Sequence, residues 1–267
     1  MVGKKNKKKS GNVPIAAPKM KSRRKARQIT SAFHTLTHAL TALQSDVDLS
    51  LDDKVEKIEK MQGQITAMGG REAYQDASIL STELHKTSKY VFQLLTKYDL
   101  RPRRGQVPLE VLEVGAINAQ LLQCSWLKVM AIDLMARHEN IVQMDFFTLT
   151  PTQHYNVVVS SMVLNCVPEP TERGRMLKMY RSHLQKEGLL FLMLPLLCLN
   201  NSNHISYDSF LHLLVAVGFT IRDCKTSAKV AFFCLQRIET VGNFTDRITA
   251  SNNKSSRKRR NDFNVLL

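Results

Sequence analysis

The sequence lacks the marks of a secreted, membrane-spanning or metal-binding protein. No apolar run approaches the length needed to cross a membrane, and the N-terminal segment has no apolar core of the kind found in signal peptides. The five cysteines share no pair spacing of the zinc type, and their odd number in apolar surroundings is typical of free thiols in a reducing compartment. We therefore expect no membrane association, no metal and no disulfide framework.

Positive charge is concentrated at the two ends of the chain. Residues 1–30 contain eleven Lys or Arg and no acidic residue, and residues 251–267 contain five against Asp262. These segments account for the whole formal net charge of +15, so the part between them is neutral. Basic ends on a neutral body favour attachment to RNA or DNA over a membrane, because neither end has an amphipathic apolar face.

The basic ends allow two interpretations. Residues 4–9, 23–27 and 257–260 are rich in Lys and Arg, which is typical of nuclear or nucleolar import signals. Such runs are equally typical of solvated ends with no further role. In both cases we expect residues 1–30 and 241–267 to be disordered tails.

The first ordered part of the chain, residues 31–105, is expected to be helical. Apolar residues recur there at spacings of three and four, which predicts about three amphipathic helices. Gly69-Gly70 ends the second helix and Arg101-Pro102 ends the third. The positions that carry this spacing are Phe33, Leu36, Leu40, Leu43 and Val47, then Leu51, Val55, Ile58, Met61, Ile65 and Met68, then Ala77, Leu80, Leu84, Thr87, Val91, Leu94 and Tyr98.

Residues 106–240 alternate short apolar runs with helical stretches, which predicts an α/β domain. The connection over residues 134–140 is too short for a full helix, and the short link between the last two strands predicts an antiparallel pair at one edge. This pattern resembles the Rossmann-like, seven-stranded methyltransferase variant of the doubly wound sheet. The expected strands are residues 109–114, 128–133, 141–144, 157–163, 189–194, 220–224 and 230–236, and the expected helices are residues 119–124, 171–185 and 207–217.

A nucleotide-cofactor site is predicted where the first two strands end. Glu113 and Val114 close an apolar run, and Gly115 then allows the backbone to approach a ligand without a Cβ in the way. Asp133 ends the next run, where a carboxylate can accept hydrogen bonds from both ribose hydroxyls. S-adenosylmethionine and NAD suit this geometry equally, but an NAD-dependent oxidoreductase would carry a Gly-x-Gly-x-x-Gly turn that the chain lacks. An ordinary glycine turn is the alternative.

Asp145 and Phe146 follow the third short strand. In methyltransferase sheets an acid here can accept a hydrogen bond from the adenine amino group, with a neighbouring ring against the base. An aspartate after a strand also commonly caps the next turn, and both interpretations of Asp145 stay open.

The loop of residues 165–168 follows the fourth strand at the switch point of the sheet, where a target base would meet the methyl donor. Asn165 offers an amide for a base edge and Pro168 stiffens the loop, although Asn is also a common turn former. Cys166 is in principle a nucleophile for cytosine-C5 methylation. No base is visible beside it, so we interpret it as a buried thiol.

A second basic stretch lies on and after the third predicted helix. Such a face could follow a phosphate backbone, and a solvated helix face is the alternative. The residues are Lys86, Lys89, Lys97, Arg101, Arg103 and Arg104.

Four segments together resemble the fungal 25S ribosomal RNA adenine-N1 methyltransferase family, over about residues 30–237. One departure is Cys166, where the family's Asn-x-Val-Pro turn is expected to hold an aromatic residue. The family also includes an animal relative that resembles a non-catalytic sensor of S-adenosylmethionine. The segments are Leu112-Glu113-Val114-Gly115-Ala116, Asp133, Gln143-Met144-Asp145-Phe146 and Val163-Leu164-Asn165-Cys166-Val167-Pro168.

The resemblance implies a nucleolar enzyme that uses S-adenosylmethionine to methylate one adenine of large-subunit rRNA, within preribosomes. It implies that Gly115 contacts the methionine end of the cofactor, Asp133 the ribose and Asp145 the adenine amine. The turn containing Asn165 and Pro168 would hold the target base. The alternative function is a regulatory module that binds S-adenosylmethionine without transferring its methyl group.

Overall fold

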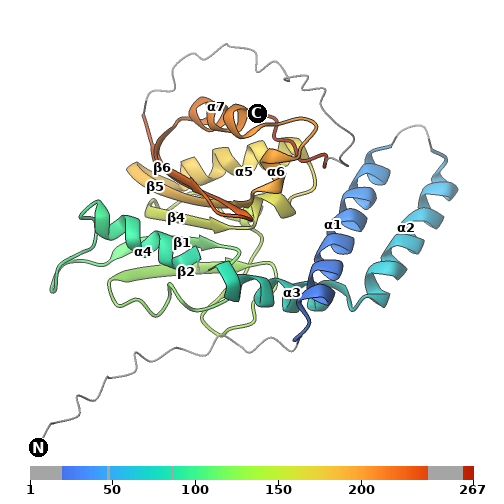
Figure 1. Ribbon diagram of the computed structural model, residues 1–267, viewed down its shortest axis with the longest axis horizontal. Helices are drawn as coiled ribbons and strands as arrows, with labels where there is room; N and C mark the ends of the chain where they lie inside the picture. Colours follow the sequence, from blue (N-terminus) through green and yellow to red (C-terminus); the bar gives the residue numbers. More distant parts are fainter. Residues whose placement is uncertain (1–19, 47–48, 86, 240–260) are drawn as a thin grey trace, which may run out of the picture.

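A seven-stranded sheet forms the centre of the molecule (Figure 1). The computed structural model describes residues 20–46, 49–85, 87–239 and 261–267. The strands are β1 (Leu109–Val114), β2 (Leu127–Asp133), β3 (Val142–Gln143), β4 (Tyr155–Ser161), β5 (Leu184–Pro195), β6 (Phe219–Thr226) and β7 (Val230–Arg237). The helices are α1 (Arg23–Ser45), α2 (Leu51–Ala67), α3 (Gly70–His85), α4 (Thr87–Lys97), α5 (Pro170–His183), α6 (Leu197–Asn200) and α7 (Tyr207–Val217).

The strand order is β3-β2-β1-β4-β5-β7-β6, and β7 runs antiparallel to both of its neighbours. The order reverses between β1 and β4, which pair in parallel with Val114 beside Ser160. Val114 also pairs with Ile132 of β2, so the carboxyl ends of these three strands lie at one edge of the sheet. The seven predicted strands and the antiparallel last pair are confirmed.

Alternating side chains give the sheet two apolar faces. One face packs against α5, α7 and the last residues of the chain, with Tyr180, Phe210 and Phe233 fully buried. The other face packs against α4, whose Val91 and Leu95 are fully buried. Helix α4 therefore belongs to the α/β body, although its residues fall within the predicted N-terminal helical region.

The predicted helix over residues 119–124 is wrong. These residues form successive turns, with Cys124 N–H donating to the Leu121 carbonyl. The face that a crossover helix would cover is already occupied by α4, and Leu121 packs into the same cluster as Leu95. The short connection between β2 and β3 contains no helix, as predicted.

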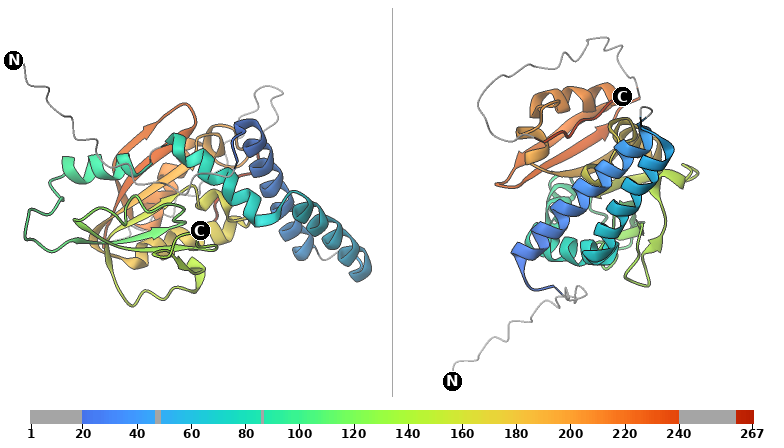
Figure 2. Two further views of the ribbon diagram at one scale, coloured as in Figure 1. Left: turned by 90° about the horizontal axis from the view of Figure 1, so that it is seen from below. Right: turned by 90° about the vertical axis from the view of Figure 1, so that its right-hand side faces the viewer.

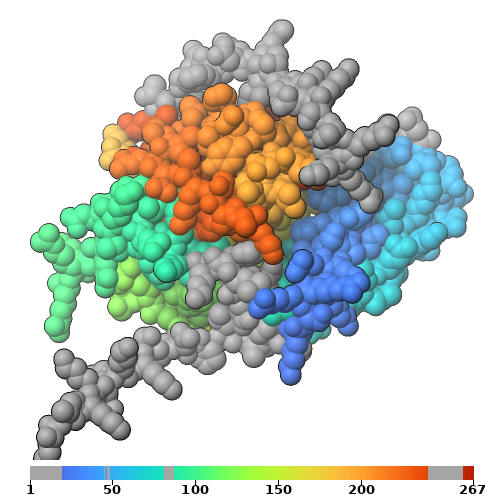
Figure 3. Space-filling view, viewed as in Figure 1, coloured from blue at the N-terminus to red at the C-terminus, as the bar shows by residue number. Residues whose placement is uncertain are grey.

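The N-terminal helices differ from prediction at two places. Helix α1 begins at Arg23, inside the expected disordered tail, because Ser22 caps it by accepting from the Lys25 N–H. The third predicted helix is two helices, α3 and α4. Gly69 and Gly70 do separate α2 from α3, with φ angles of +92° and +61°. Helices α1 and α2 lie side by side as a lobe beside the sheet body (Figures 2 and 3).

Residues 261–267 also contradict the expected disordered end. Phe263 and Val265 are buried in the core cluster of α5 and α7, and burial of two apolar side chains offsets the ordering of a short segment. The rest of the predicted tails, including residues 4–9 and 257–260, lies outside the described residues.

Within the described residues, no helix combines the length and apolar character needed to span a membrane. The same part of the chain contains no cluster of three or more His, Cys, Asp or Glu placed to hold a metal ion. All five cysteines are free thiols.

Candidate functional site

Gly115 lies in the turn that leaves β1, where its backbone adopts a φ of +75°. The N–H groups of Gly115 and Ala116 both donate to the Ile132 carbonyl, at 2.9 and 3.0 Å. A Cβ at residue 115 would lie 2.2 Å from Cγ2 of Val163, in the loop after β4. The turn therefore requires glycine for its conformation and for the close approach of a second loop.

Asp133 ends β2 with its carboxylate turned toward the protein. Oδ1 accepts from the Met135 N–H at 2.8 Å and from Nε2 of Gln75 at 2.9 Å. Burial raises the pKa of Asp133 above its ordinary value, and these two hydrogen bonds oppose that shift. Asp133 and Gly115 thus lie at adjacent strand ends, as predicted.

Three buried polar atoms at the same edge have no hydrogen-bond partner within the described residues. They are Oε2 of Glu113, Oγ of Ser161 and Oδ1 of Asn165. Glu113 lies near the end of β1, and the other two belong to the end of β4 and the loop beyond it. Burial raises the pKa of Glu113 to about 8, so its side chain is largely a neutral acid at pH 7. Unpaired buried polar atoms are costly, and their grouping indicates a ligand site.

Cys166 lies in the middle of the loop over residues 165–168. Its Sγ lies 3.0 Å from the Tyr74 hydroxyl oxygen and donates to the Met162 carbonyl at 3.0 Å. Burial raises its pKa to about 11, so the thiolate needed for nucleophilic attack is scarce at neutral pH. Cys166 is therefore a protonated thiol as predicted, although it is partly rather than fully buried.

Asp145 and Phe146 are placed differently from one another. Asp145 is exposed and its Oδ1 accepts from the Phe147 N–H at 2.9 Å, which confirms the turn cap. Phe146 is only 4% exposed and packs on Tyr180 and His183, with ring centroids 5.0 and 5.3 Å away. Its ring belongs to the core, so a contact with an adenine is better assigned to a neighbouring residue.

Helix α3 covers the site, which sequence reasoning missed. Consecutive residues Tyr74 and Gln75 reach Cys166, which lies after β4, and Asp133, which is the last residue of β2. Oε1 of Gln75 also accepts from Nε of Arg137 at 2.6 Å, and Arg137 pairs with Asp76. The burial of Gln75 is visible only in the structure, where the glutamine has the partners that a buried polar side chain needs, so no signal for it was present in the sequence.

Arg173 of α5 is a second site residue that the sequence did not reveal. It is 1% exposed, and its guanidinium donates to the carbonyls of Val167 and Pro168 at 2.8 and 2.9 Å. Arg173 therefore fixes the far end of the predicted target-base loop. Nothing in the helical pattern around residue 173 distinguishes this arginine from its exposed neighbour Arg175.

Two other surfaces contain none of the site residues described above. The second basic stretch is partly engaged within the protein, since Lys97 pairs with Asp223 and Arg101 lies 5.3 Å from the Trp126 ring centroid. A hollow of about 550 Å³ lies between the turns after β1 and the β2–β3 connection. It is lined by Ala119, Leu122, Gln123, Val129, His138, Glu139 and Asn140.

The strand order and the glycine turn define a Rossmann-like methyltransferase fold. A solved structure with this fold is the 1,6-didemethyltoxoflavin-N1-methyltransferase of Burkholderia thailandensis, with bound 1,6-didemethyltoxoflavin and S-adenosylhomocysteine. It matches with a TM-score of 0.50 and 14% identity over 73% of this chain and 93% of that chain. Residues 59–265 match the family described as 25S rRNA (adenine(2142)-N(1))-methyltransferase, Bmt2, and the chain belongs to this family.

Two curated relatives are similar along most of the chain. The 25S rRNA (adenine(2142)-N(1))-methyltransferase of Saccharomyces cerevisiae is 26% identical over 76% of this chain. The 25S rRNA adenine-N(1) methyltransferase of Schizosaccharomyces pombe is 28% identical over 67% of this chain. The matched region spans 62% of the budding-yeast relative and 70% of the fission-yeast relative.

Proposed function

We propose that this protein is an S-adenosylmethionine-dependent methyltransferase that methylates N1 of an adenine in large-subunit rRNA. The observation that carries the proposal is the grouping of unpaired buried atoms of Glu113, Ser161 and Asn165 beside Gly115. Membership of the family and the activities of the two yeast relatives support the reaction and the substrate class.

The residues at the strand ends fit the cofactor. Gly115 forms the tight turn that leaves β1, where the methionine end would lie, and Glu113 has a carboxyl group with no partner for one oxygen within the described residues. Asp133 stands where a ribose would be held, and Asp145 is exposed close by, two residues beyond β3. A cation near Glu113 would favour ionisation of its buried carboxyl group.

The bound cofactor supplies a methyl group already activated by its sulfonium. The remaining task of the protein is to hold the N1 lone pair of the adenine in line with that methyl group, and positioning can supply on the order of 7 kcal/mol. Asn165 is suited to a base edge, because its buried amide oxygen lacks a partner in the described structure. Pro168 limits the movement of the loop. A general base is not required.

Substrate binding is assigned to the basic ends and to the surface near the site. The ends carry the net charge of +15 that a phosphate backbone would attract. Activity on large-subunit rRNA would place the protein in the nucleus and nucleolus, with preribosomes as its partners, and the basic runs are compatible with import.

The decisive experiment maps modified nucleosides by mass spectrometry in large-subunit rRNA from cells with and without the protein. We expect 1-methyladenosine at one position to disappear and to return with the wild-type chain. Asp133→Asn should fail to restore it, whereas Asp52→Asn, an exposed change on α2, should restore it. Tight binding of S-adenosylmethionine with no methyl transfer would instead favour the sensor function.

A further inference from the structure

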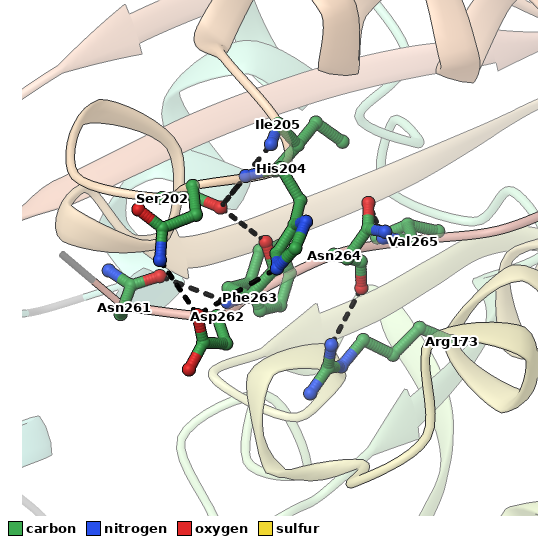
Figure 4. A network of polar contacts seen from close by, with 10 residues as sticks. Arg173, Ser202, His204, Ile205, Asn261, Asp262, Phe263, Asn264 and Val265 are labelled. Atoms are coloured by element: carbon green, nitrogen blue, oxygen red, sulfur yellow. Dashed lines mark hydrogen bonds and ion pairs between the residues drawn. The ribbon is translucent and has the colours of Figure 1, made fainter. Parts of the chain in front are cut away.

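Arg173 is a buried cation that binds backbone carbonyls rather than an acid. Besides Val167 and Pro168, it donates to the carbonyl of Asn264 at 2.6 Å, and its guanidinium lies 4.6 Å from the Phe263 ring centroid. No carboxylate within the described residues forms an ion pair with it. Burial lowers its pKa to about 10 but leaves it charged at neutral pH. One guanidinium thus joins the loop after β4 to the C-terminal segment of residues 261–267, and Figure 4 shows its contact with Asn264 of that segment.

Hydrogen bonds and close packing hold the C-terminal segment against the rest of the protein. The Leu266 N–H donates to the Pro170 carbonyl at 2.9 Å, directly after the loop. Ser202 donates to the Phe263 carbonyl, and Asn261 exchanges backbone hydrogen bonds with Asn201 and Asn203. Gly174 allows the segment to pack closely on α5, because a Cβ there would lie 1.8 Å from the Leu266 carbonyl oxygen.

A contact that only stabilised the fold would not be expected to use a buried arginine. A buried charge is costly, and apolar residues of similar volume often give equal or greater stability. A planar guanidinium instead fixes the directions of several carbonyls at once, because its donors have a rigid geometry. The carbonyls that Arg173 holds at its near side belong to Val167 and Pro168, within three residues of Asn165.

We propose that residues 261–267 act through Arg173 to position the loop of residues 165–168 for the target base. Arg173 is a positioning residue, and the C-terminal segment is the part of the chain that orients its guanidinium. The inference rests on the proposed function, in which this loop receives the adenine. It assigns a role in substrate methylation to a segment far from the cofactor residues in sequence.

Gly174→Ala tests the proposal without changing the loop or Arg173. The added methyl group must displace the Leu266 backbone, while alanine suits the interior of α5. Gly63→Ala is the matched control, because nothing lies within 4 Å of a Cβ at that helical position. The measurements are hydrogen exchange over residues 263–266, the rate of Cys166 alkylation, the S-adenosylmethionine dissociation constant, and kcat and KM for an rRNA substrate.

We expect Gly174→Ala to increase hydrogen exchange in the segment and alkylation of Cys166 by about tenfold or more, because both report loosened packing. Cofactor affinity should stay within about twofold, whereas kcat/KM for RNA should fall by about tenfold or more because the loop is misplaced. Gly63→Ala should leave all four measurements unchanged. If cofactor affinity is retained while RNA methylation falls, the cause is a misplaced loop rather than general destabilisation of the protein.

Two results would overturn the proposal. One is faster exchange in the segment with unchanged RNA methylation and Cys166 alkylation. The other is unchanged hydrogen exchange in the Gly174→Ala protein, because the close packing of Leu266 on Gly174 would then not be what holds the segment in place. Phe263→Ala and Val265→Ala provide a second comparison: the Phe263 ring lies 4.6 Å from the Arg173 guanidinium, so its loss should impair methylation more. If the wild-type chain methylates no RNA, the proposed function fails, but Cys166 alkylation still tests the coupling.

Discussion

The hydroxyl oxygen of Tyr74 lies 3.0 Å from Sγ of Cys166, although 92 residues separate them in sequence. Tyr74 stacks on Phe33 of α1, with ring centroids 4.5 Å apart, so the N-terminal helices reach the loop after β4 through this side chain. The next residue, Gln75, reaches Asp133. A single turn of α3 therefore covers the ends of two strands on opposite sides of β1.

Replacing Cys166 by Ser should preserve RNA methylation within about threefold, because burial holds the thiol pKa near 11 and leaves little thiolate to attack a base. Single-turnover methyl transfer is the measurement, with Cys198→Ser as control. A loss of a hundredfold or more, together with a covalent RNA adduct in the wild type, would establish a nucleophilic cysteine instead.

Replacing Gln75 by Ala should lower the free energy of unfolding by about 1–3 kcal/mol, because Asp133 and Arg137 each lose a buried partner. Urea unfolding gives the value. Gln93→Ala on the exposed face of α4 is the matched control and should stay within about 0.5 kcal/mol of the wild type. Equal effects of the two changes would mean that the hydrogen bonds of Gln75 do not hold α3 over the site.

Replacing Glu113 by Gln should flatten the pH dependence of stability. The folded protein retains a proton on Glu113 up to about pH 8, whereas the unfolded chain releases it near pH 4.5. The folded state binds more protons in this window, so wild-type stability falls as pH rises, with a slope of up to about 1.4 kcal/mol per pH unit from this group. Urea unfolding at several pH values should show a shallower fall in Glu113→Gln. Identical slopes would mean that Glu113 is ionised in the folded state.

Gly115→Ala should destabilise the protein, and Val163→Ala should partly restore it. The new Cβ meets Cγ2 of Val163 at 2.2 Å, and the second change removes that atom. The cost of a positive φ, about 1–2 kcal/mol, remains in the double variant. A double-mutant cycle should give a coupling of about 1 kcal/mol or more. Additive effects would rule out this contact.

Gly115→Arg should abolish binding in a titration with S-adenosylmethionine.

Neutralising the four bases of residues 257–260 should weaken RNA binding and its salt dependence. If all four contact phosphates, the slope of log K against log salt should decrease in magnitude by about 3. A variant with Lys at all four positions keeps the charge and should keep the slope. An unchanged slope in the neutral variant would assign this run to import or to no role.

The fold and the placement of Gly115 and Asp133 at one edge of the sheet could be predicted because their signals are local. Short apolar runs between helical stretches marked the strands, and β1 was placed at its observed bounds. Gly115 and Asp133 stand at strand ends, and parallel strands bring such ends together at one edge. Helix 119–124 failed because α4, an element earlier in the chain, already covers that face.

The amino-acid order by itself determined that the first two strands end at Val114 and Asp133, that a glycine and a carboxylate stand at those ends, and that charge gathers at the ends of the chain. Periodicity and charge are properties of neighbouring residues, so folding was not needed to reveal them. Only the tertiary structure decided that Gln75 meets Asp133, that Tyr74 meets Cys166, and that Arg173 holds Asn264. Such contacts join distant segments, and their partners are selected by packing rather than by sequence spacing.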